Sequence, residues 1–200
     1  MLDPAHTAVL TMELQNGVVG DSSPLRELAA ETAARNVVTN AAKILRAARQ
    51  VGARVVHCTA EFRSDRAGSN DNAPLLRALS KGDPHLLPGS NAAAVVSELG
   101  PDPSDVICTR FHGLSPFPGT NLDQTLRNLG VRTIVATGVS VNVGVLGMVL
   151  VAVDLGYGVV LATDAVAGIP TDYAQAVVDG TLRLLATAAT SEQIVAVWAP

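Results

Sequence analysis

The 200-residue sequence predicts an α/β domain: a Rossmann-like, three-layer α/β/α sandwich with a six-stranded parallel sheet. Short apolar and β-branched runs alternate with segments of helical periodicity along the whole chain. This alternation is typical of right-handed βαβ units, which build parallel sheets covered by helices on both faces. No internal repeat, low-complexity tract or second-domain boundary interrupts it, so residues 1–200 are expected to form one domain.

The composition narrows the classes of partner. Hydrophobic residues make up 48% of the chain, which is ample for one core, and the net charge is −4 without a basic run. Nucleic acid is therefore not an expected partner. No apolar run reaches the length of a bilayer span and residues 1–4 do not read as a signal sequence, so no membrane partner is expected. Cys58 and Cys108 fit neither a disulfide framework nor a metal-binding pair, which predicts a reduced, cytoplasmic setting.

The motifs predict a small-molecule substrate and no cofactor. No G-x-G-x-x-G follows a strand, and a phosphate-binding P-loop is absent from the sequence. The four histidines, at positions 6, 57, 85 and 112, form no H-x-H or H-x-x-x-H pair, so no metal site is expected.

The first half of the chain predicts two strands, at 6–12 and 54–59, joined by a long helix. Residues 24–50 carry apolar side chains at helical spacing, and Gly52 ends this helix because glycine adopts left-handed backbone most easily. The polar segment 60–73 has no periodicity and is longer than an ordinary connection. Loops of this length often cover a site.

The second half continues the alternation. Helices are expected at 74–79, 91–99, 121–129 and 171–186, with an irregular segment at 81–90. Strands are expected at 104–110, 133–137, 157–163 and 193–197.

The stretch 131–164 is the clearest unit, a strand, a sharp turn, a buried helix and a strand. Ser140 is expected to cap a helix that starts at once and is almost entirely apolar as far as Asp154. Such a helix must be buried, in part against another subunit, so the chain is expected to form a homodimer or larger homo-oligomer. Gly144 and Gly147 inside it each cost about 1 kcal/mol relative to alanine, which packing or a site must offset.

The candidate catalytic residues lie where strands end. Glu13 follows the first predicted strand, Arg110 ends the third, and residues 140–144 follow the fourth. In parallel α/β sheets the site lies beyond the carboxyl ends of the strands, near the point where the strand order reverses. We therefore expect these three places to converge.

Three segments carry a family resemblance: TAVLTMELQN at 7–16, SPFPGTNLDQTLRNLGVRTIVATGVSVNVGV at 115–145, and DLGYGVVLATDAVAG at 154–168. Together they resemble the isochorismatase-like hydrolase family, which includes isochorismatases, nicotinamidases and N-carbamoylsarcosine amidohydrolase. The resemblance covers nearly the whole chain. It implies the α/β/α fold given above and a small-molecule hydrolase.

All three catalytic positions that the resemblance implies differ here. Glu13, in Glu-Leu-Gln-Asn, stands where members typically carry the aspartate of D-x-Q-N. The family's lysine position falls on Arg110 or, counting back without a gap, on Phe111. Amide-hydrolysing members have a nucleophilic cysteine where this chain has Gly144.

Gly144 has no side chain, so covalent acyl chemistry at this point is not expected. Cys58 and Cys108 lie in other strands and are expected to be small core residues. The resemblance implies that isochorismatases can also have glycine here, and that they hydrolyse an enol (vinyl) ether by protonation and addition of water. Glu13 would be the acid. That role needs a raised pKa, which a tight pair with Arg110 would oppose.

Two alternatives stay open. In the first, Glu13 and Arg110 form a buried structural ion pair in a retired active site, and the protein binds a metabolite or acts as a scaffold. In the second, water activated at Glu13 hydrolyses an amide.

The residues expected around the pocket are candidates for substrate contact. By resemblance, the loop with His112 walls the cavity, and the turn at Ser140 forms a cis-peptide and oxyanion-binding region. Backbone N–H groups around Val143 and Gly144 are expected to bind an anion or a carbonyl. A structural role remains open for several candidates, and Asp164 is expected to be a cap. The candidate set is Gln15, His57, His112, Phe117, Thr120, Val139, Ser140, Asn142, Val143 and Gly144.

Overall fold

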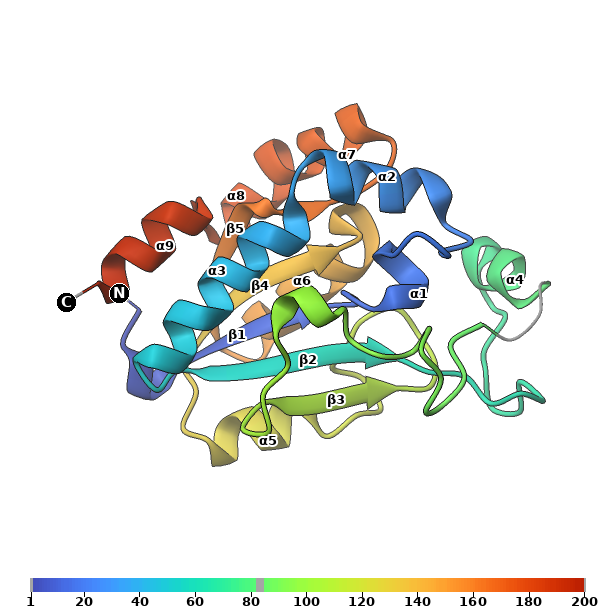
Figure 1. Ribbon diagram of the computed structural model, residues 1–200, viewed down its shortest axis with the longest axis horizontal. Coiled ribbons are helices and arrows are strands. Elements are labelled where there is room, and N and C mark those ends of the chain that lie inside the picture. The colour runs from blue at the N-terminus through green and yellow to red at the C-terminus, as the bar shows by residue number, and fades with distance from the viewer. Residues whose placement is uncertain (1, 82–84, 200) are drawn as a thin grey trace.

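A computed structural model describes residues 2–81 and 85–199, so part of the segment expected to be irregular at 81–90 lies outside the described residues. Six parallel strands form one sheet in the order β3-β2-β1-β4-β5-β6, which confirms the predicted fold class (Figure 1). The strand order reverses between β1 and β4. The strands are β1 (Thr7–Met12), β2 (Arg54–Ala60), β3 (Val106–Arg110), β4 (Thr133–Val139), β5 (Gly158–Ala167) and β6 (Thr187–Ala189).

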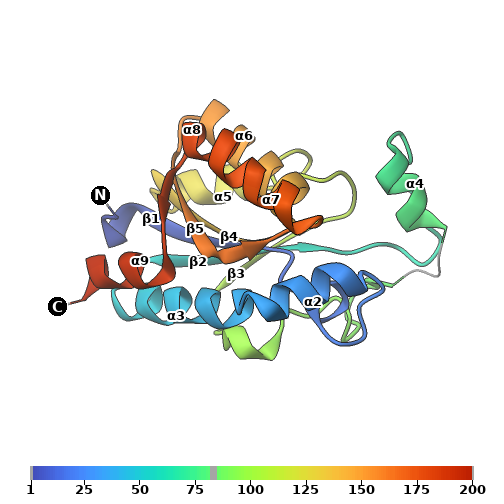
Figure 2. The same ribbon diagram turned by 90° about the horizontal axis from the view of Figure 1, so that it is seen from above.

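Helices cover both faces of the sheet, as Figure 2 shows. One layer holds α2 (Arg26–Ala34), α3 (Val37–Gln50) and α9 (Ser191–Trp198). The other holds α5 (Leu122–Asn128), α6 (Leu146–Asp154), α7 (Thr171–Val177) and α8 (Arg183–Leu185). Two hydrophobic clusters follow from this arrangement, one on each face. Ile44 and Leu45 of α3 are fully buried in the first, and Met148 and Val149 of α6 in the second.

Two predicted helices are corrected by the structure. The segment 24–50 forms α2 and α3, separated where Asn36 adopts a left-handed φ of 55°. The segment 91–99 is mostly turns and ends in the 3-10 helix η2 (Ser97–Leu99). The backbone of this segment bonds to another part of the chain instead of forming helical turns: Val95 forms an isolated antiparallel bridge with Gln15.

The predicted last strand at 193–197 is wrong. These residues belong to α9, and the sixth strand is β6, just before it. Thr190 caps α9, and Gln193 completes a capping box that starts the helix. Ile194 and Trp198, four residues apart, are the buried pair, which is helical spacing.

The turn after β4 differs from the prediction in one respect. A π-helical turn, η3 (Val141–Val145), precedes α6, and the Ser140 side chain makes no capping bond. The Ser140 hydroxyl instead donates to Asn142 Oδ1 at 3.2 Å. The Val139–Ser140 peptide is cis, as the resemblance implies.

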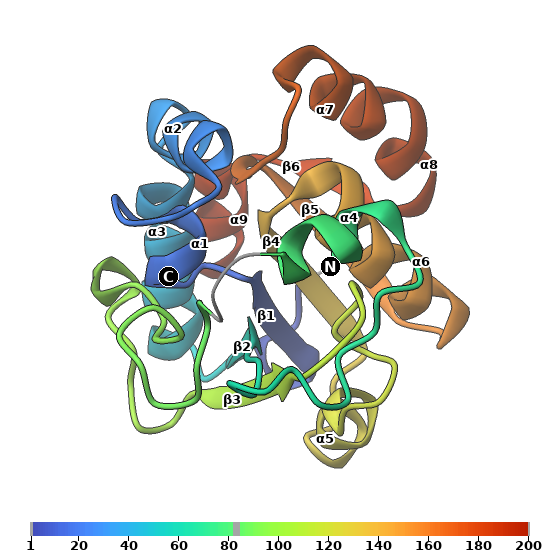
Figure 3. The same ribbon diagram turned by 90° about the vertical axis from the view of Figure 1, so that its right-hand side faces the viewer.

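The carboxyl ends of the strands face the viewer in Figure 3, and α4 (Pro74–Ser80) lies in front of them. The predicted helix at 74–79 is therefore confirmed, and it belongs to a segment that covers this edge of the sheet. The short helix α1 (Asn16–Val19) follows β1 at the same edge. Among the described residues, no helix has both the length and the apolar character needed to cross a membrane.

Candidate active site

Glu13 directly follows β1 and has a positive φ of 52°. Left-handed backbone is uncommon for a residue with a side chain and is found most often where the surrounding structure enforces it. Here the Glu13 N–H donates to the Cys58 carbonyl at 2.9 Å and extends the β1–β2 pairing by one residue. The sheet thereby fixes the backbone from which the carboxylate projects.

Arg110 provides the cation of the site. It is the last residue of β3 and is only 7% exposed. Its Nη2 donates to Glu13 Oε1, and its Nη1 donates to the Gly113 carbonyl at 2.7 Å. Phe111 is 53% exposed and points elsewhere. The structure thus gives the cationic position to Arg110 and not to Phe111.

The Arg110 guanidinium keeps its charge and one free donor. Burial lowers the pKa of Arg110 to about 10, so the group remains protonated near neutral pH. Its Nε is buried without a hydrogen-bond partner in the described part of the chain. Arg110 is therefore a charged side chain held in place by Glu13 and by the Gly113 carbonyl.

A cavity of about 560 Å³ opens beside Glu13 and Arg110. This volume lies within the usual range for small-molecule sites. Arg66 and His85 are its other polar side chains, and His85 is held by the Gly17 carbonyl at 3.0 Å. The remaining lining is apolar. It comes from α1, the segment before α2, the end of β2 and the residue pair after it, α4 and the segment after α4: Gly17, Val18, Pro24, Leu25, Ala60, Phe62, Leu75, Ala78, Leu79 and Leu86.

Gly144 does not line this cavity, because the side chain of Met12 fills the space above it. A Cβ at Gly144 would lie 2.9 Å from Met12 Cε and 3.2 Å from the Val139 carbonyl oxygen. A side chain at position 144 would therefore require the flexible end of Met12 to move. Val139 lies in the first core cluster, next to this contact.

One of the two backbone N–H groups predicted to bind an anion in the turn after β4 is already bonded within the turn. The Val143 N–H donates to the Ser140 carbonyl at 3.1 Å, so it is already used. Asn142 donates to the Ile169 carbonyl at 3.1 Å and ties the turn to the end of β5. The cavity lining includes none of these residues.

Gln15 is a structural residue and not a substrate contact. It is fully buried, and its Nε2 donates to the carbonyls of Ala60 at 3.0 Å and Ala93 at 2.7 Å. Its Oε1 accepts from the Ala60 N–H at 2.8 Å. These bonds hold the end of β2, and so the floor of the cavity, against the 91–99 segment.

His57 is also placed away from the cavity, contrary to its prediction as a substrate contact. Its Nδ1 lies 2.8 Å from Thr11 Oγ1 and its Nε2 lies 3.2 Å from Asp105 Oδ2. Burial lowers the pKa of His57. Arg49 pairs with the same Asp105 carboxylate at 2.7 Å, so His57 belongs to a buried structural network.

The predicted wall at 112–120 is corrected as well. His112 is exposed, and Phe117 is buried in the core beside Tyr157, with ring centroids 6.2 Å apart. Thr120 Oγ1 donates to the Pro116 carbonyl at 2.6 Å and accepts from the Leu122 N–H at 3.2 Å, which anchors the start of α5. This loop supports the second core cluster and leaves the cavity wall to other elements.

Two structural predictions are confirmed. The Asp164 carboxylate accepts from the Ser191 N–H at 2.7 Å and from its hydroxyl at 2.6 Å, so it caps α9. Cys58 and Cys108 are buried neighbours on β2 and β3, and burial raises the pKa of both thiols. Neither is a nucleophile for this site.

Sequence reasoning missed most of the cavity wall. Leu75 and Leu79 of α4, Leu25 at the start of α2 and Arg66 in the loop after β2 were not among the candidates. The only signal for them was the unusual length of the polar segment 60–73, which predicted a cover without saying which side chains it contributes. No group of three or more metal-ligating side chains occurs in the described ranges.

A parallel α/β sheet with a carboxylate and a cation at its strand ends, beside a largely apolar cavity, is the arrangement in which α/β proteins commonly bind small molecules. Residues 7–193 match the family model described as Isochorismatase domain, so the chain belongs to the isochorismatase family. It is accordingly a hydrolase of that family, as its named relatives are.

Individual relatives agree with this assignment. The chain is 29% identical over 188 residues to ureidoacrylate amidohydrolase RutB of Rhizobium rhizogenes, covering 87% of this chain and 75% of the relative. A solved isochorismatase family protein from Burkholderia thailandensis is 28% identical, with a TM-score of 0.80 over 99% of this chain and 97% of its own. N-carbamoylsarcosine amidase from Thermoplasma acidophilum shares the fold at 23% identity, with a TM-score of 0.74 over 94% of this chain and 97% of its own.

Proposed function

We propose that this protein hydrolyses a small amide or ureido compound with a water molecule activated by Glu13, without a covalent intermediate. The observation that carries the proposal is the ion pair of Glu13 and Arg110 at the floor of the cavity. At the usual nucleophile position this chain has Gly144, and the Met12 side chain packs against it.

The pair favours a base over an acid. A guanidinium in direct contact stabilises the carboxylate form, and only the carboxylate can take a proton from water. Enol-ether hydrolysis requires the opposite, a protonated Glu13 that delivers its proton to the substrate. We therefore place amide hydrolysis ahead of the enol-ether reaction that the sequence first suggested. The names of two relatives, an amidohydrolase and an amidase, support the same order.

Each residue then has a defined task. Glu13 takes a proton as water attacks the carbonyl carbon, and returns it to the departing nitrogen. Arg110 stabilises the negative charge that develops on the carbonyl oxygen. The apolar walls exclude bulk water and strengthen these charge interactions.

A retired site that only binds a metabolite is the second candidate, because a buried ion pair alone can be structural. The test is a panel of primary amides, ureido acids and isochorismate, followed by ammonia release and product chromatography. Turnover of an amide or ureido compound is expected, with a loss of about 10²–10⁴-fold in kcat for Glu13→Gln.

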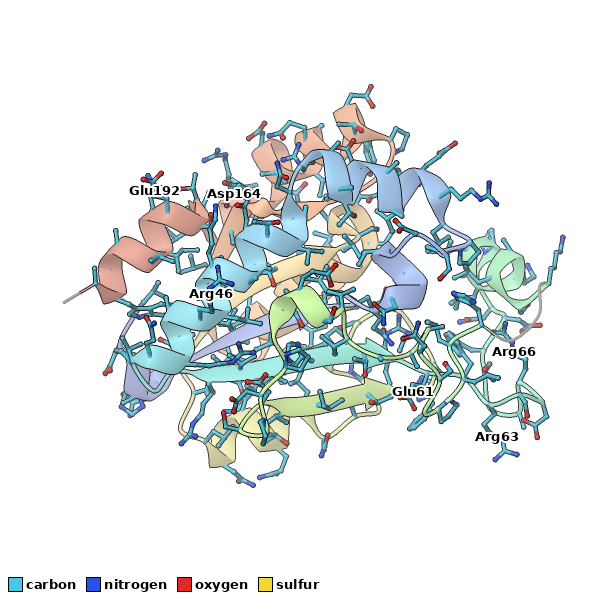
Figure 4. All side chains as sticks on the ribbon, viewed as in Figure 1. Arg46, Glu61, Arg63, Arg66, Asp164 and Glu192 are labelled. Carbon is cyan, nitrogen blue, oxygen red and sulfur yellow. The ribbon has the colours of Figure 1, made fainter. Side chains whose placement is uncertain are left out.

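Glu61→Gln is the matched control, because Glu61 lies at the end of β2 outside the cavity lining (Figure 4). This variant should keep full activity. Intact-mass spectrometry during turnover should show no adduct on the protein. Ligand binding without turnover of any panel member, or a trapped acyl-protein, would overturn the proposed reaction.

A further inference from the structure

Arg66 lines the cavity and has no acidic partner among residues 2–81 and 85–199. Its guanidinium carbon lies 5.2 Å from the centroid of the Phe62 ring, and its Nη2 donates to the Leu79 carbonyl at 3.4 Å, a long bond. Its Nε is buried and has no hydrogen-bond partner in the same residues. The ring therefore orients a cation whose hydrogen-bonding capacity is mostly unused.

Arg63, three residues earlier in the same loop, provides the contrast. It is exposed (Figure 4). It forms a two-bond pair with Asp65, at 2.9 and 2.7 Å. The loop thus contains one arginine that is neutralised at the surface and one that faces the cavity without an acidic partner in the part of the chain that the structure describes.

The charges of the cavity lining do not balance. Glu13 is matched by Arg110 in a direct ion pair, so among the described lining residues Arg66 is a positive charge without an acidic partner, within largely apolar walls. A cation in such surroundings attracts an anion more strongly than it would in water. A guanidinium binds a carboxylate with two parallel hydrogen bonds, and the unused donors of Arg66 suit that arrangement.

Resting on the proposed hydrolysis, we propose that the substrate is a carboxylate with an apolar body, and that Arg66 binds the carboxylate. The apolar side chains of α2 and α4 contact the body, and the bond to be hydrolysed lies near Glu13. A single negative charge completes the balance of the cavity. Arg66 is then the residue that selects anionic over neutral substrates.

The test measures binding by calorimetry and does not require turnover. The probes are 4-phenylbutanoate and 4-phenyl-1-butanol, which share an apolar body and differ in the charged end. The wild-type protein should bind the carboxylate at least about tenfold more tightly than the alcohol, since a charge-assisted hydrogen bond supplies that difference. Arg66→Gln should remove this preference and leave the affinity for the alcohol unchanged. Arg63→Gln should retain the preference.

Three results would overturn the assignment. The first is a wild-type protein that does not bind the carboxylate, and the second is an Arg66→Gln variant that keeps the preference or loses both ligands equally. The third is a Glu13→Gln variant that binds the carboxylate markedly more tightly than the wild type does. Such a gain would place the carboxylate at Arg110, where Glu13 competes with it. A carboxylate at Arg66 will bind to this variant with nearly unchanged affinity. Because binding is measured directly, a failure of the proposed hydrolysis and a failure of this site are distinguishable.

Discussion

The guanidinium of Arg110 reaches the carboxylate of Glu13 across the end of a strand that lies between them. Glu13 follows β1 and Arg110 ends β3, and β2 separates these strands in the sheet. Ala60, the last residue of β2, is the register partner of Arg110 and has a side chain too small to block the contact. The ion pair therefore joins two non-neighbouring strands at the edge of the cavity. A change to either residue is expected to affect both the stability of the fold and the chemistry of the site.

Removal of Arg110 should destabilise the protein more than removal of both charges. Arg110→Leu leaves the largely buried Glu13 carboxylate without its partner, which is expected to lower the free energy of unfolding by about 3–5 kcal/mol. Glu13→Gln combined with Arg110→Leu should cost clearly less than the sum of the single changes. Urea denaturation of the wild type, both single variants and the double variant measures this coupling. Additive losses would show that the two groups do not interact.

Introduction of the missing thiol should not create a cysteine hydrolase. In Gly144→Cys the new Cβ would meet Met12 Cε and the Val139 carbonyl, so the variant is expected to lose about 1–3 kcal/mol of stability through overpacking. Met12 is the flexible partner, and Met12→Ala should be less harmful in the Gly144→Cys background than alone. Thermal denaturation tests the coupling, and iodoacetamide labelling tests whether the thiol is accessible. Rapid labelling of Gly144→Cys without loss of stability would contradict the filled space seen here.

Lowering the pH should reduce the free energy of unfolding, because the buried His57 must then take up a proton. Burial lowers the pKa of His57 in the folded state below the value of about 6.5 expected in the unfolded chain. The unfolded state thus takes up the proton first, so the contribution is fully present above about pH 6.5 and is lost as the pH falls toward the folded-state pKa. Unfolding free energy measured from pH 7.5 to 5 should fall in the wild type. His57→Gln should have a flatter profile, and the exposed His112→Gln should retain the wild-type slope.

The exposed face of α6 is proposed to be covered by a second copy of the chain. Leu150 is 43% exposed and Val153 is 36% exposed on a helix that the sequence predicts to be buried. Sedimentation velocity should show a dimer or larger species for the wild type and a monomer for Leu150→Glu, because a charge in an apolar interface is poorly tolerated. Val197→Glu on α9, in the opposite layer, is the control and should keep the wild-type assembly. A monomeric wild type would contradict the proposal.

The strands and the meeting of Glu13 with Arg110 could be predicted because local signals specify them. Apolar runs mark β1 to β5, and polar residues at the ends of parallel strands lie at the same edge of the sheet, which predicted that Glu13 and Arg110 come together. The last strand was missed because residues 193–197 alternate weakly, and only the Thr190 capping box and the Ile194–Trp198 spacing distinguish the helix.

The cavity wall could not be predicted because tertiary contacts decide it. His57 and Gln15 have side chains suited to a site, yet each finds buried partners in neighbouring segments that are distant in sequence. Leu75 and Leu79 look like ordinary exposed residues of a short helix, and only the position of α4 over the strand ends gives them a role. Met12 reads as a core residue, and nothing local shows that it fills the space above Gly144.

The contribution of α4 to substrate binding can be separated from catalysis. Leu75 and Leu79 lie four residues apart, on the face of α4 that lines the cavity, and both side chains are partly exposed. Leu75→Ala and Leu79→Ala should each raise KM for an apolar substrate by about 3–10-fold, since each removes methyl groups that a bound ligand would cover. The kcat should stay unchanged because Glu13 and Arg110 are untouched, and stability should change little.

Arg77→Ala is the control on the same helix, because Arg77 donates to the Asp71 carbonyl at 2.8 Å and lies outside the lining. Steady-state kinetics on the substrate found in the panel measures these effects, and a fall in kcat with constant KM would show that α4 acts on the reacting groups instead of on the body of the substrate.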